Sequence, residues 1–176
     1  MACTLTTGRG LPCKNSVGGL KAIYFANYGT LGNATITAGE ITDLSGLTID
    51  FFKYDIKGNS SLETTINSSR ESGTSFYSQV LNVTLTYLDK ATQEELKIIV
   101  SARPHVVVED YNGNFFLLGL EHGTEVTGGT IVSGAAMGDL SGFTLTMEAQ
   151  ETAPAYFIDS ALITATESAV QIDPEA

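Results

Sequence analysis

Apolar and polar residues alternate along most of this chain with the two-residue period that is typical of half-buried β-strands. The clearest case is the stretch 142–150, whose apolar face consists of Phe143, Leu145, Met147 and Ala149. Similar patterns predict strands at 20–28, 34–38, 40–44, 61–68, 75–87 and 124–132. A longer strand is predicted at 47–57, where the apolar parity switches between Phe51 and Phe52. Such a switch indicates either a bulge or a strand that is covered on both faces.

Turn signals join several of these strands into hairpins. The dipeptide Asn112-Gly113 separates two apolar runs, and it predicts a tight type I′ turn because both residues tolerate positive φ. The polar tip 69–74 joins 61–68 to 75–87 in a long hairpin. A loop of small residues, 134–142, joins 124–132 to the strand that follows.

A single helix is predicted from Asp89 to Ala102. Asp89 is a good N-cap, or Thr92 and Glu95 form a capping box one turn later. Pro104 ends the helix. The residues that share its predicted sheet-facing side are Leu96, Ile99, Val100 and Arg103.

The order of elements is strands, one helix, then strands. This order predicts a mainly β fold, an antiparallel β-sandwich or barrel with one flanking α-helix at about 89–102. We divide the chain into an N-terminal arm (1–19), a β domain (20–158) and an acidic C-terminal tail (159–176). The arm is rich in glycine, which disfavours a continuous helix or strand.

The composition favours a protein whose surface is partly buried against other subunits. Only 16% of the residues are charged, and the many Ser and Thr residues make uncharged surfaces that suit subunit contacts. The net charge of −11 argues against a protein that binds nucleic acid tightly. Residues 1–39 hold three bases and no acid, so a basic end and an acidic body could attract each other between copies. Chance clustering of three charges is the alternative.

Residues for catalysis or metal binding are scarce. His105 and His122 are the only histidines, and there is no Gly-x-Ser-x-Gly elbow, so we expect no enzyme. The adjacent acids Glu109 and Asp110 are expected to point to opposite faces of a strand. Cys3 and Cys13 are too few for a disulfide framework, and reduced thiols are expected, although a pair is possible. We therefore expect no cofactor and no metal, and we find no signal peptide or membrane span.

Several stretches resemble tail tube proteins of tailed bacteriophages. The similarity covers roughly 8–158, and its motifs are structural turns and strands rather than catalytic signatures. The stretches that carry it are Val106-Val-Val-Glu-Asp-Tyr-Asn-Gly-Asn-Phe-Phe-Leu-Leu-Gly119, Gly123-Thr-Glu-Val-Thr-Gly-Gly-Thr130, Gly134-Ala-Ala-Met-Gly-Asp139, Gly142-Phe-Thr-Leu-Thr-Met-Glu-Ala-Gln-Glu-Thr-Ala-Pro-Ala-Tyr156, and the arm with Gly8-Arg9, Cys13-Lys14 and Gly18-Gly19-Leu-Lys-Ala-Ile-Tyr-Phe.

The resemblance implies a virion protein that is assembled in the cytoplasm of a bacterial host. In that family, subunits form hexameric rings whose sheets join into one closed β-barrel. The rings stack into the tail tube, through which DNA passes during ejection without specific binding. Partners would then be further copies of the chain and other tail proteins, such as a terminator, a baseplate or tip, and a sheath in contractile tails.

Two groups of residues follow as candidates under this hypothesis. An acidic lumen would repel phosphate, and its candidate acids are Asp50, Asp55, Glu63, Glu125 and Glu148. The candidate inter-subunit contacts are Arg9, Lys14, Lys21, Arg70 and Glu71, because the arm and the tip 69–74 are expected at subunit contacts. The alternatives are a tail terminator, a head-tail connector or a secretion-tube ring of the same fold, or a soluble β-sandwich binding module.

Overall fold

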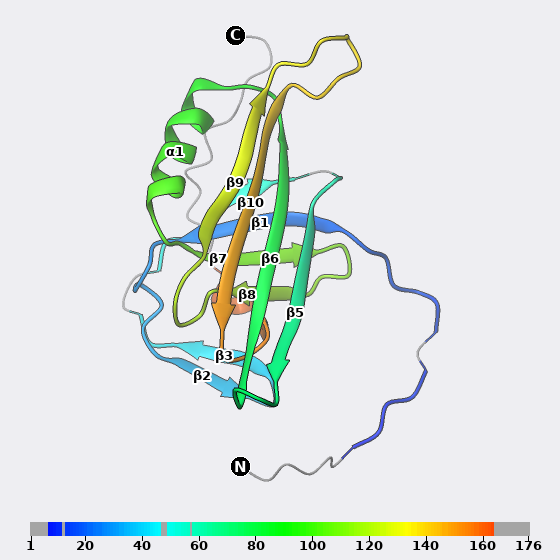
Figure 1. The fold of residues 1–176 in the computed structure, drawn as a ribbon, viewed down its shortest axis with the longest axis vertical. Coiled ribbons are helices and arrows are strands. Elements are labelled where there is room, and N and C mark those ends of the chain that lie inside the picture. The colour runs from blue at the N-terminus through cyan, green and yellow to red at the C-terminus, as the bar shows by residue number, and fades with distance from the viewer. Residues whose placement is uncertain (1–6, 12, 47–48, 57, 164–176) are drawn as a thin grey trace.

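The computed structural model describes residues 7–11, 13–46, 49–56 and 58–163, which fold into two β-sheets and one α-helix (Figure 1). The larger sheet has seven strands, in the spatial order β2 (Ala34–Thr37), β3 (Glu40–Leu44), β11 (Tyr156–Ile158), β8 (Phe115–Leu118), β7 (His105–Asp110), β1 (Leu20–Ala26) and β4 (Phe52–Asp55). The smaller sheet has the order β5 (Ser61–Ser69), β6 (Thr74–Thr86), β10 (Gly142–Glu151) and β9 (Glu125–Val132).

The two sheets lie face to face, and their strands run in different directions. In Figure 1 the long strands of the four-stranded sheet cross in front of the shorter strands of the other sheet. Apolar residues from both sheets meet between them in one core cluster, which includes Ile23, Leu81, Val106 and Met147. The mainly β sandwich predicted from the sequence is confirmed, but neither sheet closes into a barrel within the subunit.

A second core cluster covers the far face of the seven-stranded sheet. Tyr24 and Val107 contribute to it from the sheet, and Leu31 and Phe51 contribute from loops. β1 and β7 are therefore buried on both faces, which explains the apolar runs at 22–26 and 106–108 in their centres. Leu162 and Ile163 also pack against this cluster, so the packing continues past the predicted domain boundary at 158.

The helix α1 (Lys90–Ser101) forms where the sequence predicts it. Asp89 is the N-cap, and its side chain accepts a hydrogen bond from the backbone N–H of Thr92. Leu96 and Ile99 are buried against the core between the sheets. Val100 is 55% exposed, so the predicted apolar face is too wide, because the helix contacts the sheets along a narrow stripe only.

The turn at 111–114 has a different geometry from the predicted type I′ turn. Gly113 has positive φ, but Asn112 does not. The carboxylate of Asp110 accepts the backbone N–H groups of Asn112 and Asn114 and fixes the turn from its first residue. A side-chain acceptor at this position removes the need for two residues with positive φ.

Two further strand predictions need correction. Of the strand predicted at 47–57, residues 47, 48 and 57 lie outside the described part of the chain, and among the others β4 spans Phe52–Asp55. Its register with β1 is regular, and Phe51 and Ile56 pack into different core clusters, so the parity switch reflects cover on both faces and no bulge. The strand pairs are also not all antiparallel, because β11 of the seven-stranded sheet pairs in parallel with β3.

Candidate functional site

The candidate site is the face of the four-stranded sheet that points away from the other sheet, which we call the outer face. Side chains of β6 and β10 alternate strictly between the buried core and this face. Register with the neighbouring strands extends the outer face across the whole sheet. Its apolar side chains are Phe76, Val80 and Val132. Its polar residues include Glu63, Thr65 and Asn67 of β5, Ser78, Asn82 and Thr84 of β6, Thr144, Thr146, Glu148 and Gln150 of β10, and Glu125 and Thr130 of β9.

Three of the predicted lumen acids lie together in one row across this face. Glu63 is paired with Val80, Val80 with Glu148, and Glu148 with Glu125. None of the four strands contains Lys or Arg. Residues directly opposite each other in neighbouring strands share a face, so the row presents its carboxylates on the outer side of the sheet.

Hydrogen bonds tie the polar side chains of the outer face to one another. Ser78 donates to the Glu148 carboxylate at 2.7 Å. Thr146 donates to the side-chain oxygen of Asn82 at 3.0 Å. These contacts hold the polar groups in place, so the outer face is an ordered surface of hydroxyls, amides and carboxylates.

The sheet ends in two edge strands. Among the described residues, β5 pairs only with β6, and β9 pairs only with β10. The helix α1 lies beside β9, and the Arg103 guanidinium approaches Glu125 at 3.7 Å across this edge (Figure 1). Unpaired strand edges of this length are available for pairing with another chain.

The remaining predicted lumen acids lie elsewhere. Asp55 belongs to β4, at an edge of the seven-stranded sheet, and its carboxylate forms an ion pair with Lys53 at 3.0 Å. Asp50 is exposed in the segment before β4. The structure therefore gathers three of the five candidates on one face and leaves two outside it.

The predicted contact residues occupy three separate places. Arg9 and Lys14 are exposed in the arm, which extends away from the sandwich on the β5 side (Figure 1). Arg70 and Glu71 are exposed at the tip between β5 and β6. Cys13 is an exposed free thiol, whereas Cys3 lies outside the described residues.

Lys21 already has a partner within the subunit. Its ammonium group lies 2.6 Å from Oε1 of Glu109, and this hydrogen bond raises the pKa of Lys21. The Tyr24 hydroxyl donates to Oε2 of Glu109, and burial together with this bond raises the pKa of Tyr24 to about 12. Glu109 and Asp110 point to different surroundings, as their adjacency in a strand predicts.

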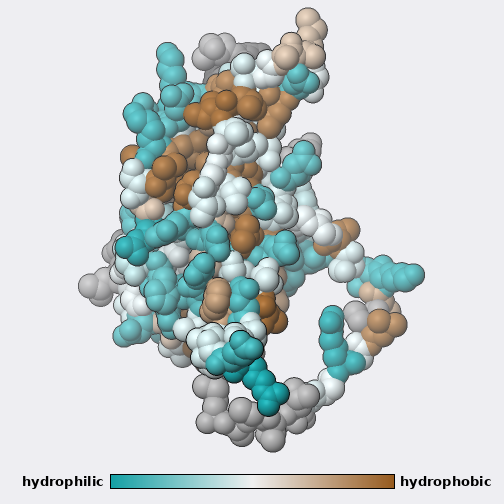
Figure 2. Space-filling model, viewed as in Figure 1, coloured by the Kyte–Doolittle hydropathy of each residue, from teal (hydrophilic) through white to brown (hydrophobic). Residues whose placement is uncertain are grey.

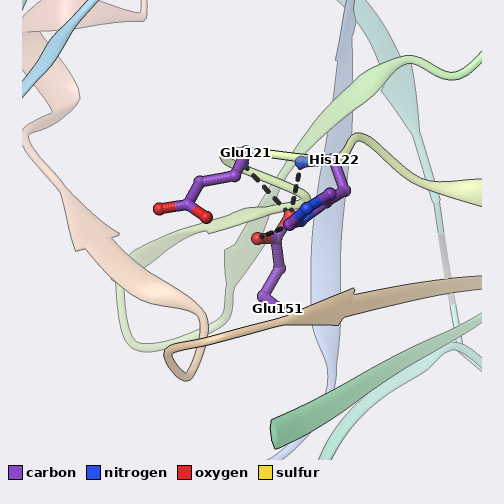
Figure 3. Close-up of side chains that lie close together, drawn as sticks. All are labelled: Glu121, His122 and Glu151. Atoms are coloured by element: carbon purple, nitrogen blue, oxygen red, sulfur yellow. Dashed lines mark hydrogen bonds and ion pairs between the residues drawn. The ribbon is translucent and has the colours of Figure 1, made fainter.

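Glu121, His122 and Glu151 form the one group with metal-ligand atoms close together in the described part of the chain, within 4.8 Å of one another (Figure 3). The buried Glu151 carboxylate accepts the backbone N–H groups of Glu121 and His122 through Oε1. Its Oε2 lies 3.1 Å from Nδ1 of His122. Both oxygens therefore hold the turn that follows β8, and we assign Glu151 this structural role.

Two buried polar residues of β6 and β10 connect the sheets, and the sequence analysis missed both. Gln79 donates to the carbonyl of Ala153 and accepts the backbone N–H of Gly119. Glu151 secures the neighbouring turn. The sequence does hold a signal for both residues. Each stands where the alternation of its strand calls for an apolar residue, and a polar residue at such a position usually has buried hydrogen-bond partners.

Comparison with protein-family models, curated proteins and solved structures finds no match for this chain. Within the described residues, no helix is long and apolar enough to cross a membrane. The functional conclusion therefore depends on the geometry and charge of the chain itself.

Proposed function

We propose that this chain is a structural ring subunit of the tail-tube type, in which the four-stranded sheets of neighbouring copies join edge to edge and enclose a channel. The observation that carries the proposal is the outer face, where strands without Lys or Arg hold a row of three carboxylates, of which Glu125 alone is paired with a cation, Arg103 at the β9 edge. In such a ring, the outer face of every copy lines the channel. Stacked rings would then form a tube for the passage of DNA.

The strand directions allow the sheet to continue from copy to copy. Each of the three strand pairs in the sheet is antiparallel, so β5 and β9 at its two edges run in opposite directions. A rotation about the ring axis preserves strand direction, and β5 of one copy meets β9 of the next as an antiparallel partner. Closure of the ring then removes all exposed edges of this sheet.

Each edge strand also carries an apolar side chain that the subunit leaves uncovered. Ile66 of β5 and Ile131 of β9 are on the core-facing side of the sheet, opposite Tyr77 and Phe143. They are nevertheless 69% and 61% exposed. A neighbouring strand and the residues behind it would cover these side chains, which favours assembly.

The row of acids is unfavourable in an isolated subunit and useful in a channel. Glu148 and Glu125 are directly opposite each other, and like charges in this position destabilise a sheet. Arg103 approaches this row as the ion-pair partner of Glu125. The strands themselves add only carboxylates, amides and hydroxyls, so a channel lined by them has little to hold a DNA phosphate.

Size-exclusion chromatography and negative-stain imaging of the purified full chain test the proposal. We expect rings or tubes with a central hole. A single ring that never stacks would support the terminator or connector alternative. A stable monomer at high concentration across salt conditions would contradict the ring proposal and favour a soluble binding module.

A further inference from the structure

Three side chains with metal-ligand atoms meet where the turn after β8 lies against the end of β10. Glu121 and His122 belong to this turn, and Glu151 is the last residue of β10. Figure 3 shows the Glu151 carboxylate between the His122 ring and the Glu121 side chain. One imidazole and two carboxylates form a donor set that suits first-row divalent ions such as Zn²⁺.

The Glu151 carboxylate is held in position before any ion binds. Its side chain is only 4% exposed, and its Oε1 accepts the backbone N–H groups of Glu121 and His122. These bonds fix Oε2, which lies 3.1 Å from Nδ1 of His122. Ligand atoms about 2.1 Å from a tetrahedral zinc ion are about 3.4 Å from one another, so Nδ1 and Oε2 nearly span one edge of a zinc site.

Glu121 is placed to supply a third ligand. The ligand atoms of the three residues all lie within 4.8 Å of one another, and the Glu121 side chain is exposed, so rotation about its own bonds brings its carboxylate closer. In the described part of the chain, the ion pairs formed by Lys and Arg all involve other acids. A divalent cation would neutralise the two carboxylates, which no Lys or Arg there compensates.

A small pocket beside the two carboxylates has room for a further ligand. Its volume is about 60 Å³, and its lining includes Glu121, Glu151, Gln79 and Thr152. This volume is sufficient for a water molecule. Figure 2 shows that hydrophilic side chains dominate the half of the molecule in which β10 ends, whereas apolar side chains gather towards the end near α1. A hydrated ion would therefore approach over a polar surface.

We propose that Glu121, His122 and Glu151 bind a divalent transition-metal ion of the Zn²⁺ type. Its ligands are Nδ1 of His122, Oε2 of Glu151 and one carboxylate oxygen of Glu121, and water completes the tetrahedron. The ion replaces the proton between Nδ1 and Oε2, so the neutral imidazole carries its proton on Nε2. Because β8 belongs to the seven-stranded sheet and β10 to the four-stranded sheet, the bound ion ties the two sheets together. This inference does not depend on the proposed ring.

The sequence analysis predicts no metal because the ligands are not close along the chain. Glu121 and His122 are neighbours, but Glu151 follows His122 by 29 residues. Only the folded hairpin of β9 and β10 brings the end of β10 back to the turn after β8.

Calorimetric titration of the full chain with zinc chloride tests the site. A Cys3→Ser/Cys13→Ser background is used, since thiolates also bind zinc. We expect one Zn²⁺ per chain and a thermal midpoint that rises by about 3 °C or more at saturating zinc, because an ion that binds the native state stabilises it. Magnesium chloride should produce neither effect, since Mg²⁺ prefers a full set of oxygen ligands. A parent protein that binds no zinc would overturn the inference.

Two single variants locate the ion. Glu121→Gln and His122→Gln each remove a ligand and retain the backbone bonds to Oε1 of Glu151, so circular dichroism should show an unchanged fold. Each should weaken zinc binding about tenfold or more, since even an outer-shell partner of a metal contributes this much. The matched control is Glu40→Gln, which neutralises an exposed acid of β3 and should bind zinc as the parent does. Equal zinc affinity in all three variants would place the ion elsewhere and overturn the inference.

Discussion

At the scale of single residues, His105 joins three segments around the seven-stranded sheet. Its Nδ1 lies 2.6 Å from the carbonyl oxygen of Gly119, and its Nε2 lies 3.1 Å from the backbone N of Gly29. Since a backbone N–H only donates, Nε2 is the acceptor and Nδ1 carries the proton. The ring also stacks on Tyr28. This arrangement fits the neutral imidazole, because a second ring proton would face the Gly29 N–H.

Acid should therefore destabilise the fold through His105. Burial lowers the pKa of His105 below its ordinary value of 6.5, so the unfolded chain takes up this proton first as the pH falls. The stabilisation is complete above pH 6.5 and is lost as the pH falls towards the folded-state pKa. We therefore expect the unfolding free energy to fall between pH 7 and pH 5.5 through this group.

The check is urea unfolding of wild type and His105→Gln at both pH values. The variant is expected to be less stable at pH 7 and to lose less unfolding free energy than wild type on acidification. An identical acid-side loss in the two proteins would show that other groups cause it.

The turn at 111–114 shows that the sequence predicts the position of a turn better than its type. Asn112-Gly113 correctly places a turn, because positive φ at Gly113 is a local property of glycine. The type of turn was wrong, since it depends on the Asp110 carboxylate, which competes for the same backbone N–H groups. The pairing of Glu109 with Lys21 depends on strand register between β1 and β7, which local patterns do not fix.

At the scale of elements, the edge strand β5 is where assembly should be most sensitive. Ile66→Lys places a charge at the uncovered core-facing position of this edge, while the 69% exposure of Ile66 predicts little effect on the subunit fold. A charge at a strand edge opposes pairing with a second strand. We expect the thermal midpoint to remain within a few degrees of wild type, while ring formation falls at least tenfold by analytical ultracentrifugation.

Ile36→Lys, at the β2 edge of the seven-stranded sheet, provides the comparison. It introduces the same charge at another exposed apolar position and should leave ring formation unchanged. If both variants assemble as wild type does, the four-stranded sheet is not the seam.

The arm is a second element whose role is open to test. Residues 7–11 and 13–18 of the arm are exposed, and the side chain of Leu11 does not pack against the sandwich. Deletion of residues 2–16 should leave a folded subunit with an unchanged circular dichroism spectrum. We expect the deleted protein to stack into tubes poorly, as counted in negative-stain images. Tubes of normal length and number would refute a role of the arm in assembly.

Elements with strong local patterns and the hairpins between neighbouring strands were predicted well, whereas pairings between segments far apart in sequence were not. The hairpin of β5 and β6, the hairpin of β9 and β10, and α1 follow from alternation, tip residues and an N-cap. The parallel pairing of β11 with β3 joins residues that are far apart in sequence and leaves no local signal. The three acids of the outer face were named as candidates, but their common row became visible only from the registers of three strand pairs.

At the scale of the whole molecule, the distribution of charge separates the four-stranded sheet from the rest of the surface. All nine Lys and Arg residues of the sequence lie outside its strands. In a ring, every copy would contribute its row of Glu63, Glu148 and Glu125 to the same belt around the channel. Stacked rings repeat the belt, so a weak attraction or repulsion between one belt and the DNA phosphates is multiplied along the tube.

Reversal of this belt should convert a non-binding channel into one that retains DNA. We expect assembled wild-type protein to leave a short fluorescent single-stranded DNA free at physiological salt, as measured by co-sedimentation. The triple variant Glu63→Lys/Glu125→Lys/Glu148→Lys should retain the DNA, with an affinity that falls steeply as salt increases, because each lysine–phosphate contact releases counterions.

The control must carry the same net charge on a different surface. Glu40→Lys/Asp43→Lys/Glu121→Lys reverses three exposed acids outside the four-stranded sheet. If this variant binds DNA as strongly as the triple variant of the outer face, net charge alone explains retention. A ring structure in which Lys and Arg line the channel would contradict the assignment of the outer face, because the four-stranded sheet would then face away from the lumen.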